Sequence, residues 1–167
     1  MNYKSIIINE LRQMNMKLGI AESVTGGMIS SALVDVSHAS HVFKGSVVTY
    51  TIEAKNKLLG VHLETIDKYG EVSAQVAKEM ALGIRERLKT DFSVAVTGIA
   101  EPRDEDKQCL VYFCIIAVDK AYEYEMTTPN EGRMTNRIVI ASKVIQELFE
   151  LVWKLKSGSK STKKVEI

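Results

Sequence analysis

Short apolar segments alternate with amphipathic ones along most of the chain, and this alternation limits the folds that the chain can adopt. Apolar, β-branched runs predict strands at residues 17–23, 45–51, 92–96, 109–118 and 122–127. Helical spacing of apolar residues predicts helices at residues 3–15, 26–34, 53–59, 64–69, 73–89 and 132–155. Strands that are separated by helices favour parallel pairing. The order therefore predicts an α/β protein, a three-layer α/β/α sandwich with a mixed, mostly parallel sheet of about five strands.

The apolar runs also indicate where the middle and the edge of this sheet lie. Phe92 to Val96 is almost continuously apolar, which is typical of a strand that is covered on both faces. Asp119 and Lys120 predict a turn, after which residues 122–127 pair back on the preceding strand as a hairpin. The hairpin adds an antiparallel strand to the sheet.

Length and composition bound the domain organisation and the classes of partner. The chain has 167 residues, of which 46% are hydrophobic and 26% charged, as expected of one globular domain. We expect a single domain at residues 1–156 and a polar, basic tail at 157–167. The formal net charge of +1 indicates neither nucleic acid nor membrane as a partner.

The cysteines and the amino terminus predict a cytoplasmic protein. The two cysteines, Cys109 and Cys114, lie in an apolar run without the spacing of a zinc or redox motif, so we expect buried thiols in a reducing compartment. The first residues lack the apolar core of a signal peptide. No apolar run approaches the roughly 20 residues that a membrane-spanning helix needs.

Three polar segments follow predicted strands and are the candidates for a site. They are residues 22–27, 49–55 and 97–100. In open α/β sheets, ligands bind beyond the carboxyl ends of the strands, and parallel strands bring these ends to one edge. The three segments are therefore predicted to meet.

The residue types in these segments allow two interpretations. Ser23 offers a hydroxyl, Gly26 and Gly27 let backbone amides approach a ligand, and Lys55 offers an amine with Tyr50 beside it. A serine next to a lysine is an alternative to the serine–histidine pair in nucleophilic catalysis. The other interpretation is structural, because serine and threonine before a helix are most often caps and glycine pairs are most often turns.

Five motifs, in order, resemble a known family, the carboxy-terminal domain of the competence/damage-inducible protein CinA, or nicotinamide-nucleotide amidohydrolases. The family pattern runs A-E-S-C-T-G-G, V-T-Y-S-N-E-A-K, L-G-V with Y-G-A-V-S, T-G-I-A-G-P and G-D-R. This chain has A-E-S-V-T-G-G from Ala21, V-T-Y-T-I-E-A-K from Val48, L-G-V with Y-G-E-V-S from Leu59, T-G-I-A-E-P from Thr97 and E-G-R from Glu131. The resemblance covers about residues 3–155. The chain resembles the stand-alone form of the family, without the amino-terminal domain that the family often carries.

The resemblance implies an activity and a set of site residues. Family members hydrolyse the carboxamide of nicotinamide mononucleotide, a small pyridine nucleotide, to nicotinate mononucleotide and ammonia, with no metal and no cofactor. It implies Ser23 as nucleophile, Lys55 as base and Tyr50 as helper. The oxyanion and the substrate are then held by the segments that contain Thr25, Gly26, Gly27, Thr97 and Gly98. Arg133 and Arg137 are candidates for the substrate phosphate, or else a solvated start of the last helix.

Departures from the family pattern keep a second hypothesis open. Val24 replaces a cysteine, Thr51 and Ile52 replace a serine and an asparagine, and the glycine-rich third loop becomes acidic at residues 101–108. Acidic residues repel a phosphate, which a glycine loop can bind. The alternative is therefore a catalytically silent paralogue that serves as a ligand-binding or assembly module. Homo-oligomerisation also stays open, because a small domain can cover a sheet edge by pairing with a second copy.

Overall fold

The computed structural model describes residues 2–102, 104 and 108–160. Five strands and six α-helices alternate through these residues, with one short 3₁₀ helix, η1, at Ala39–His41. The order is α1 (Tyr3–Gln13), β1 (Leu18–Glu22), α2 (Met28–Val34), β2 (Phe43–Val48), α3 (Ile52–Leu59), α4 (Leu63–Tyr69), α5 (Ala74–Leu88), β3 (Phe92–Gly98), β4 (Cys109–Ala117), β5 (Lys120–Thr128) and α6 (Arg133–Lys160).

The strands form one mixed sheet in the order β2-β1-β3-β4-β5. β1 pairs in parallel with both β2 and β3, whereas β4 pairs antiparallel with β3 and with β5. Four of the five described strands thus run in one direction and β4 runs against them. The predicted α/β class and the predicted hairpin are confirmed. The sequence pattern does not specify that β4 pairs antiparallel with β3.

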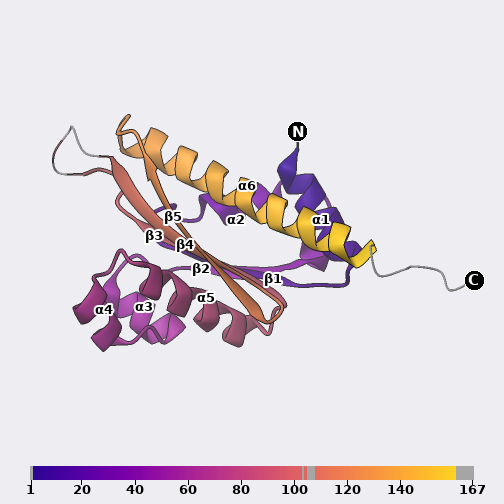
Figure 1. Ribbon diagram of the computed structural model, residues 1–167, viewed down its shortest axis with the longest axis horizontal. Helices are drawn as coiled ribbons and strands as arrows, with labels where there is room; N and C mark the ends of the chain where they lie inside the picture. Colours follow the sequence, from indigo (N-terminus) through magenta and orange to yellow (C-terminus); the bar gives the residue numbers. More distant parts are fainter. Residues whose placement is uncertain (1, 103, 105–107, 161–167) are drawn as a thin grey trace, which may run out of the picture.

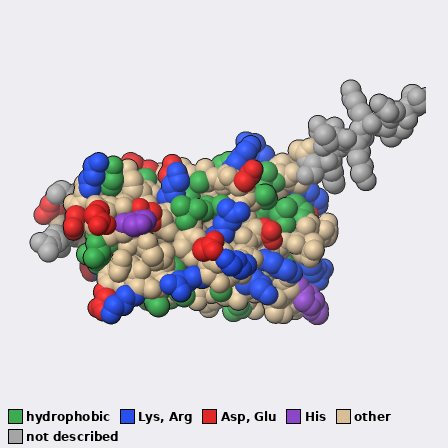
Figure 2. Space-filling view, turned by 90° about the horizontal axis from the view of Figure 1, so that it is seen from below, with side chains coloured by type: hydrophobic (Ala, Val, Ile, Leu, Met, Phe, Trp, Pro, Cys, Tyr) green, Lys and Arg blue, Asp and Glu red, His purple; other side chains and the backbone are tan. Residues whose placement is uncertain are grey.

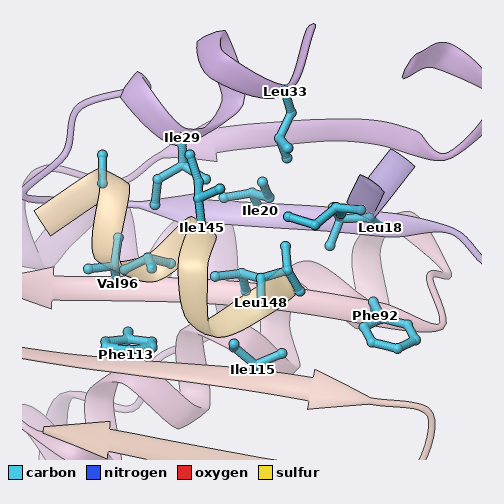
Figure 3. Close-up of a cluster of buried hydrophobic side chains, with 14 of the residues drawn as sticks. Leu18, Ile20, Ile29, Leu33, Phe92, Val96, Phe113, Ile115, Ile145 and Leu148 are labelled. Atoms are coloured by element: carbon cyan, nitrogen blue, oxygen red, sulfur yellow. The ribbon is translucent and has the colours of Figure 1, made fainter. Parts of the chain in front are cut away.

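Helices cover both faces of the sheet, which makes three layers (Figure 1). α1, α2 and α6 lie on one face and α3, α4 and α5 on the other. Side chains alternate between the faces along each strand, so that Leu18 and Ile20 point into the α6 layer while Ala21 points toward α5. Figure 3 shows the α6-side core, in which Ile145 and Leu148 of α6 meet the strand residues.

Small residues on the opposite face bring α5 close to the sheet. Gly19, Ser93 and Ala95 face this helix, and Ser93 Oγ donates a hydrogen bond of 2.8 Å to the carbonyl oxygen of Ala81 within α5. Larger side chains at these positions would hold the helix away from the strands. The close packing positions the α3–α4–α5 layer under the carboxyl ends of β1, β2 and β3.

Several element boundaries differ from those predicted, each for a local reason. α2 begins at Met28 rather than at residue 26, because Gly26 and Gly27 have φ values of +59° and +98°, which are not helical. β2 ends at Val48 because Thr51 caps α3, accepting a hydrogen bond from the Ala54 amide. The last helix continues to Lys160 rather than ending at residue 155. Within the described ranges, no helix is long and apolar enough to cross a bilayer.

Candidate active site

The carboxyl ends of β1, β2 and β3 lie at one end of the sheet, as the parallel pairing requires. A cavity of about 320 Å³ opens there. The starts of α3 and α6 and the loop after β3 lie at the same end of the molecule (Figure 1). The three polar segments that follow the strands therefore do meet. The cavity is lined by Ser23, Val24, Tyr50, Glu71, Val72, Thr97, Gly98, Ile99, Ala100, Glu101 and Arg133.

Ser23, which lines this cavity, is in direct contact with Lys55. Ser23 follows β1 and is 6% exposed, and Lys55 of α3 is fully buried. The Lys55 Nζ donates hydrogen bonds to Ser23 Oγ at 3.1 Å and to the Thr49 carbonyl oxygen at 3.2 Å. A lysine without exposed surface has to be satisfied by protein groups, since burying an unpaired charge is costly. The pair that the family motifs suggested is therefore assembled here.

Glu71 completes the surroundings of Lys55, and sequence reasoning missed it. Its Oε1 lies 2.7 Å from Lys55 Nζ, so the three N–H groups of the ammonium have three acceptors. Glu71 also lines the cavity. The available signal was the Y-G-E-V-S segment, in which Glu71 stands where the family pattern has alanine.

Glu22 fixes the turn that carries Ser23, and it too was missed as a site residue. Its carboxylate is fully buried at the end of β1. Oε2 accepts hydrogen bonds from Thr25 Oγ1 at 2.6 Å and from the amides of Gly27 at 3.0 Å and Ile29 at 3.2 Å. Oε1 accepts from the amide and the hydroxyl of Ser30 at 2.8 and 2.6 Å. The buried carboxylate is thus stabilised by five hydrogen-bond donors, some of which lie in the first turn of α2.

The amides of the glycine pair are engaged within the protein. The Gly26 amide donates to the Ser23 carbonyl oxygen at 3.0 Å, and the Gly27 amide donates to Glu22. Within the residues that the structure describes, the amides of Val24 and Thr25 have no hydrogen-bond partner. Val24 lines the cavity, whereas Thr25 is fully buried, so the Val24 amide is the donor in this turn that a ligand could reach.

The two arginines at the start of α6 occupy different places. Arg137 braces the Ser23 turn: its Nε donates to the Val24 carbonyl oxygen at 3.1 Å and its Nη2 to that of Thr25 at 3.0 Å. Arg133 lines the cavity and donates to the hydroxyl oxygen of Tyr50. Tyr50 is 54% exposed and therefore lies at the rim. Of the two phosphate candidates, Arg133 is the one that faces the cavity.

The loop after β3 forms the opposite wall. Thr97 is buried and donates its hydroxyl to the carbonyl oxygen of Glu71 at 3.1 Å, which ties the two walls together. A Cβ at Gly98 would stand 2.9 Å from the Val111 side chain, so this position needs glycine. Asn136 of α6, which sequence reasoning missed, donates to the Ala100 carbonyl oxygen at 2.8 Å and is buried.

The charges at the cavity are mixed. Glu71 and Glu101 contribute carboxylates to the lining and Arg133 a guanidinium. Of the acidic loop at 101–108, residues 103 and 105–107 lie outside the described part. Both signs of charge also occur across the face in Figure 2, which views the molecule from below. Among the described residues no group of three or more His, Cys, Asp or Glu side chains could hold a metal ion.

The comparison with known proteins identifies the family. Residues 2–152 match the family model of the CinA C-terminal domain, so the fold and the site belong to a CinA-type α/β domain. The chain is a member of the CinA C-terminal domain family.

Relatives include both stand-alone and longer proteins. The chain is 38% identical to the protein MG115 homolog of Mycoplasma pneumoniae, over 90% of this chain and 97% of that protein. It is 46% identical to a CinA-like protein of Prochlorococcus marinus over 66% of this chain, but this match spans only 27% of that protein.

Solved structures agree with the assignment. A competence/damage inducible protein from Agrobacterium tumefaciens superposes with a TM-score of 0.81 at 31% identity, covering 90% of this chain and 96% of that one. A CinA superfamily protein from Escherichia coli superposes with a TM-score of 0.83 at 29% identity, covering 89% of this chain and 88% of that one.

Proposed function

We propose that the protein is an amidohydrolase that converts nicotinamide mononucleotide to nicotinate mononucleotide and ammonia by a serine–lysine mechanism. The observation that carries this proposal is the 3.1 Å contact between Lys55 Nζ and Ser23 Oγ next to the cavity. A buried lysine in hydrogen-bond contact with a serine hydroxyl is the arrangement that such a nucleophile requires. Membership of the CinA family supports the choice of substrate.

The chemistry would proceed through an acyl-enzyme. Lys55, as the free amine, takes the proton of Ser23 while Oγ attacks the carboxamide carbon. The proton then passes to the departing nitrogen, which leaves as ammonia, and an ester to Ser23 remains. Water, activated by the same amine, hydrolyses this ester and releases the carboxylate product. The reaction uses water alone as co-substrate.

The backbone of the Ser23 turn would stabilise the oxyanion of both steps. The Val24 amide is the unused donor at the cavity, because the amides of Gly26 and Gly27 are engaged and Thr25 is fully buried. Donors that are fixed before the reaction contribute most to acyl transfer. Glu22 and Arg137 hold this turn from opposite sides and so keep the donor in place.

The test is ammonia release from nicotinamide mononucleotide by the wild type and by two variants. Ser23→Ala and Lys55→Met are expected to lose at least about 100-fold in kcat, since each removes a reacting group. Lys57→Met is the matched control, because Lys57 lies on the same helix with its side chain 69% exposed. Its rate should equal that of the wild type.

The opposite result would favour the second function. Folded wild-type protein that releases no ammonia, in an assay in which another family member does, would contradict the amidohydrolase. The protein would then be a ligand-binding or assembly module that keeps the family cavity. The changed loop after β3, with Glu101 in the cavity wall, is the observation that favours this alternative.

A further inference from the structure

Glu71 is a charged group in the cavity to which the proposed reaction assigns no role. Its side chain is 39% exposed, while that of its partner Lys55 has no exposed surface. Of the three acceptors around Lys55 Nζ, which are Ser23 Oγ, the Thr49 carbonyl oxygen and Glu71 Oε1, only the last belongs to a charged group. Glu71 therefore presents a carboxylate to the cavity, two hydrogen bonds away from the reacting hydroxyl.

The position of this carboxylate bears on what the cavity binds. The 2.7 Å contact with Lys55 and the 3.1 Å contact of Lys55 with Ser23 place Glu71 beside any amide that Ser23 attacks. A carboxylate there attracts a positive charge close to the amide and repels a negative one.

We propose that Glu71 selects amides whose ring carries a fixed positive charge next to the carboxamide, as a pyridinium does. This inference rests on the proposed function and assigns a specificity-determining residue to the same site. The cationic ring shares the Glu71 carboxylate with Lys55 and weakens their ion pair.

Two features make Glu71 rather than Glu101 the selecting group. Glu101 lines the cavity from the loop after β3, and within the described residues no hydrogen bond or ion pair joins it to Ser23 or Lys55. Glu71, in contrast, is coupled to the reacting pair by a direct ion pair. It lines the cavity beside that pair and is thus a specificity residue.

The experiment compares two substrates whose rings differ in charge and in reduction at C4. Nicotinamide mononucleotide has a cationic ring, and its 1,4-dihydro form has the same carboxamide, sugar and phosphate on a neutral ring. The ratio of the two kcat/KM values is measured for the wild type, Glu71→Gln, Glu71→Asp and Glu101→Gln. A pyridinium amide is intrinsically more electrophilic, so the readout is the change in this ratio between variants.

We expect Glu71→Gln to lower the ratio about fivefold, the upper end of the effect of a partly exposed charge pair. Glu71→Asp should restore most of the preference, because it restores the charge. Glu101→Gln should leave the ratio within about twofold of the wild type. An unchanged ratio in Glu71→Gln, or an equal drop in Glu101→Gln, would overturn the assignment.

A binding measurement separates this inference from the proposed reaction. Dissociation constants for both nucleotides are measured by calorimetry in the Ser23→Ala background, with and without the additional Glu71→Gln substitution. A preference for the cationic nucleotide that disappears with this substitution supports the inference even if the wild type releases no ammonia. Equal preferences with and without the carboxylate would overturn it even if the amidohydrolase is real.

Discussion

At the scale of single residues, two buried charges define the Ser23 turn. Glu22 has five donors around its carboxylate, and Lys55 has three acceptors around its ammonium. Each charge would be expensive to bury alone, and each is acceptable because its partners satisfy it. The turn that carries Ser23 is consequently held by Glu22, and the Ser23 hydroxyl is held by Lys55.

Glu22→Gln tests how much the carboxylate stabilises the fold. The glutamine oxygen can still accept from Ser30, but its amide group would face the Gly27 and Ile29 amides, which are also donors. Two backbone donors would lose their acceptor in a buried site. We expect the free energy of unfolding to fall by about 3 kcal/mol, measured by urea denaturation.

The control for this loss is Glu86→Gln, which removes a charge from a side chain that is 80% exposed. Its unfolding free energy should change by no more than about 0.5 kcal/mol. If Glu22→Gln were as mild as this control, the hydrogen-bond network would not be a stabilising element of the turn.

Arg133→Gln tests whether the cavity guanidinium recognises a phosphate. Arg133 contacts Tyr50 at the rim and lines the cavity, while Arg137 is committed to backbone carbonyls. We expect KM for nicotinamide mononucleotide to rise about tenfold, because a charge-assisted contact is lost. KM for nicotinamide riboside, which has no phosphate, should stay unchanged. An equal rise for both substrates would show that Arg133 shapes the cavity without reading the phosphate.

The sequence predicts the central pair of the site but not its supports. Ser23, Tyr50 and Lys55 lie in short motifs at the ends of predicted strands, so convergence of parallel strands suffices to bring them together. Glu71 contacts Lys55 across 16 positions, and Arg137 contacts Thr25 across 112. Such contacts depend on how α3 and α6 are placed in three dimensions, which local periodicity does not contain.

At the scale of secondary-structure elements, the packing of α5 against α3 requires a glycine, Gly83. A Cβ at Gly83 would stand 2.0 Å from the carbonyl oxygen of Leu59 at the end of α3. The two helices therefore touch through backbone at this point. Periodicity correctly predicts α5 as a helix, yet it does not show that a glycine inside it marks a crossing with α3.

Gly83→Ala tests whether the close contact between α3 and α5 is required for stability. Alanine favours a helix over glycine by about 1 kcal/mol, so propensity alone predicts a more stable protein. The clash with Leu59 opposes this gain, because the backbone atom cannot turn away as a side chain would. We expect a net loss of about 2 kcal/mol in thermal or urea unfolding, together with reduced activity, since α3 carries Lys55.

Gly158→Ala is the matched substitution, also within a helix, and nothing lies within 4 Å of the added Cβ. It should leave stability unchanged or raise it by up to about 1 kcal/mol. Equal effects of the two substitutions would mean that the contact between α3 and α5 imposes no steric requirement.

At the scale of the whole molecule, β4 is an inner strand of the sheet, and its side chains reach the cores on both faces. It pairs with β3 on one side and with β5 on the other, although it runs against both. Cys109 and Cys114 lie on it and are fully buried. The sequence correctly predicts buried thiols from the apolar run, whereas the place of β4 in the sheet depends on a pairing choice that the run does not encode.

Burial makes the Cys114 thiol a probe of global unfolding. Burial raises the pKa of Cys114 from 9.0 to about 12, so the folded protein keeps this thiol protonated at neutral and mildly alkaline pH. The unfolded chain ionises it near the ordinary value. The thiol therefore contributes stability in full below pH 9, and this contribution is lost as the pH rises through about 12.

We expect Ellman's reagent to modify Cys114 only when the whole domain unfolds, because β4 has a paired strand on each side and a helix layer over each face. In a Cys109→Ala background, the opening free energy from labelling rates in low urea should equal the unfolding free energy from circular dichroism. Raising the pH from neutral to about 9 should speed labelling of the urea-unfolded chain and of the folded protein by about the same factor, because both react through the exposed thiol of the unfolded chain. An opening free energy several kcal/mol below the global value would instead assign β4 and β5 to a unit that opens independently of the α5 layer.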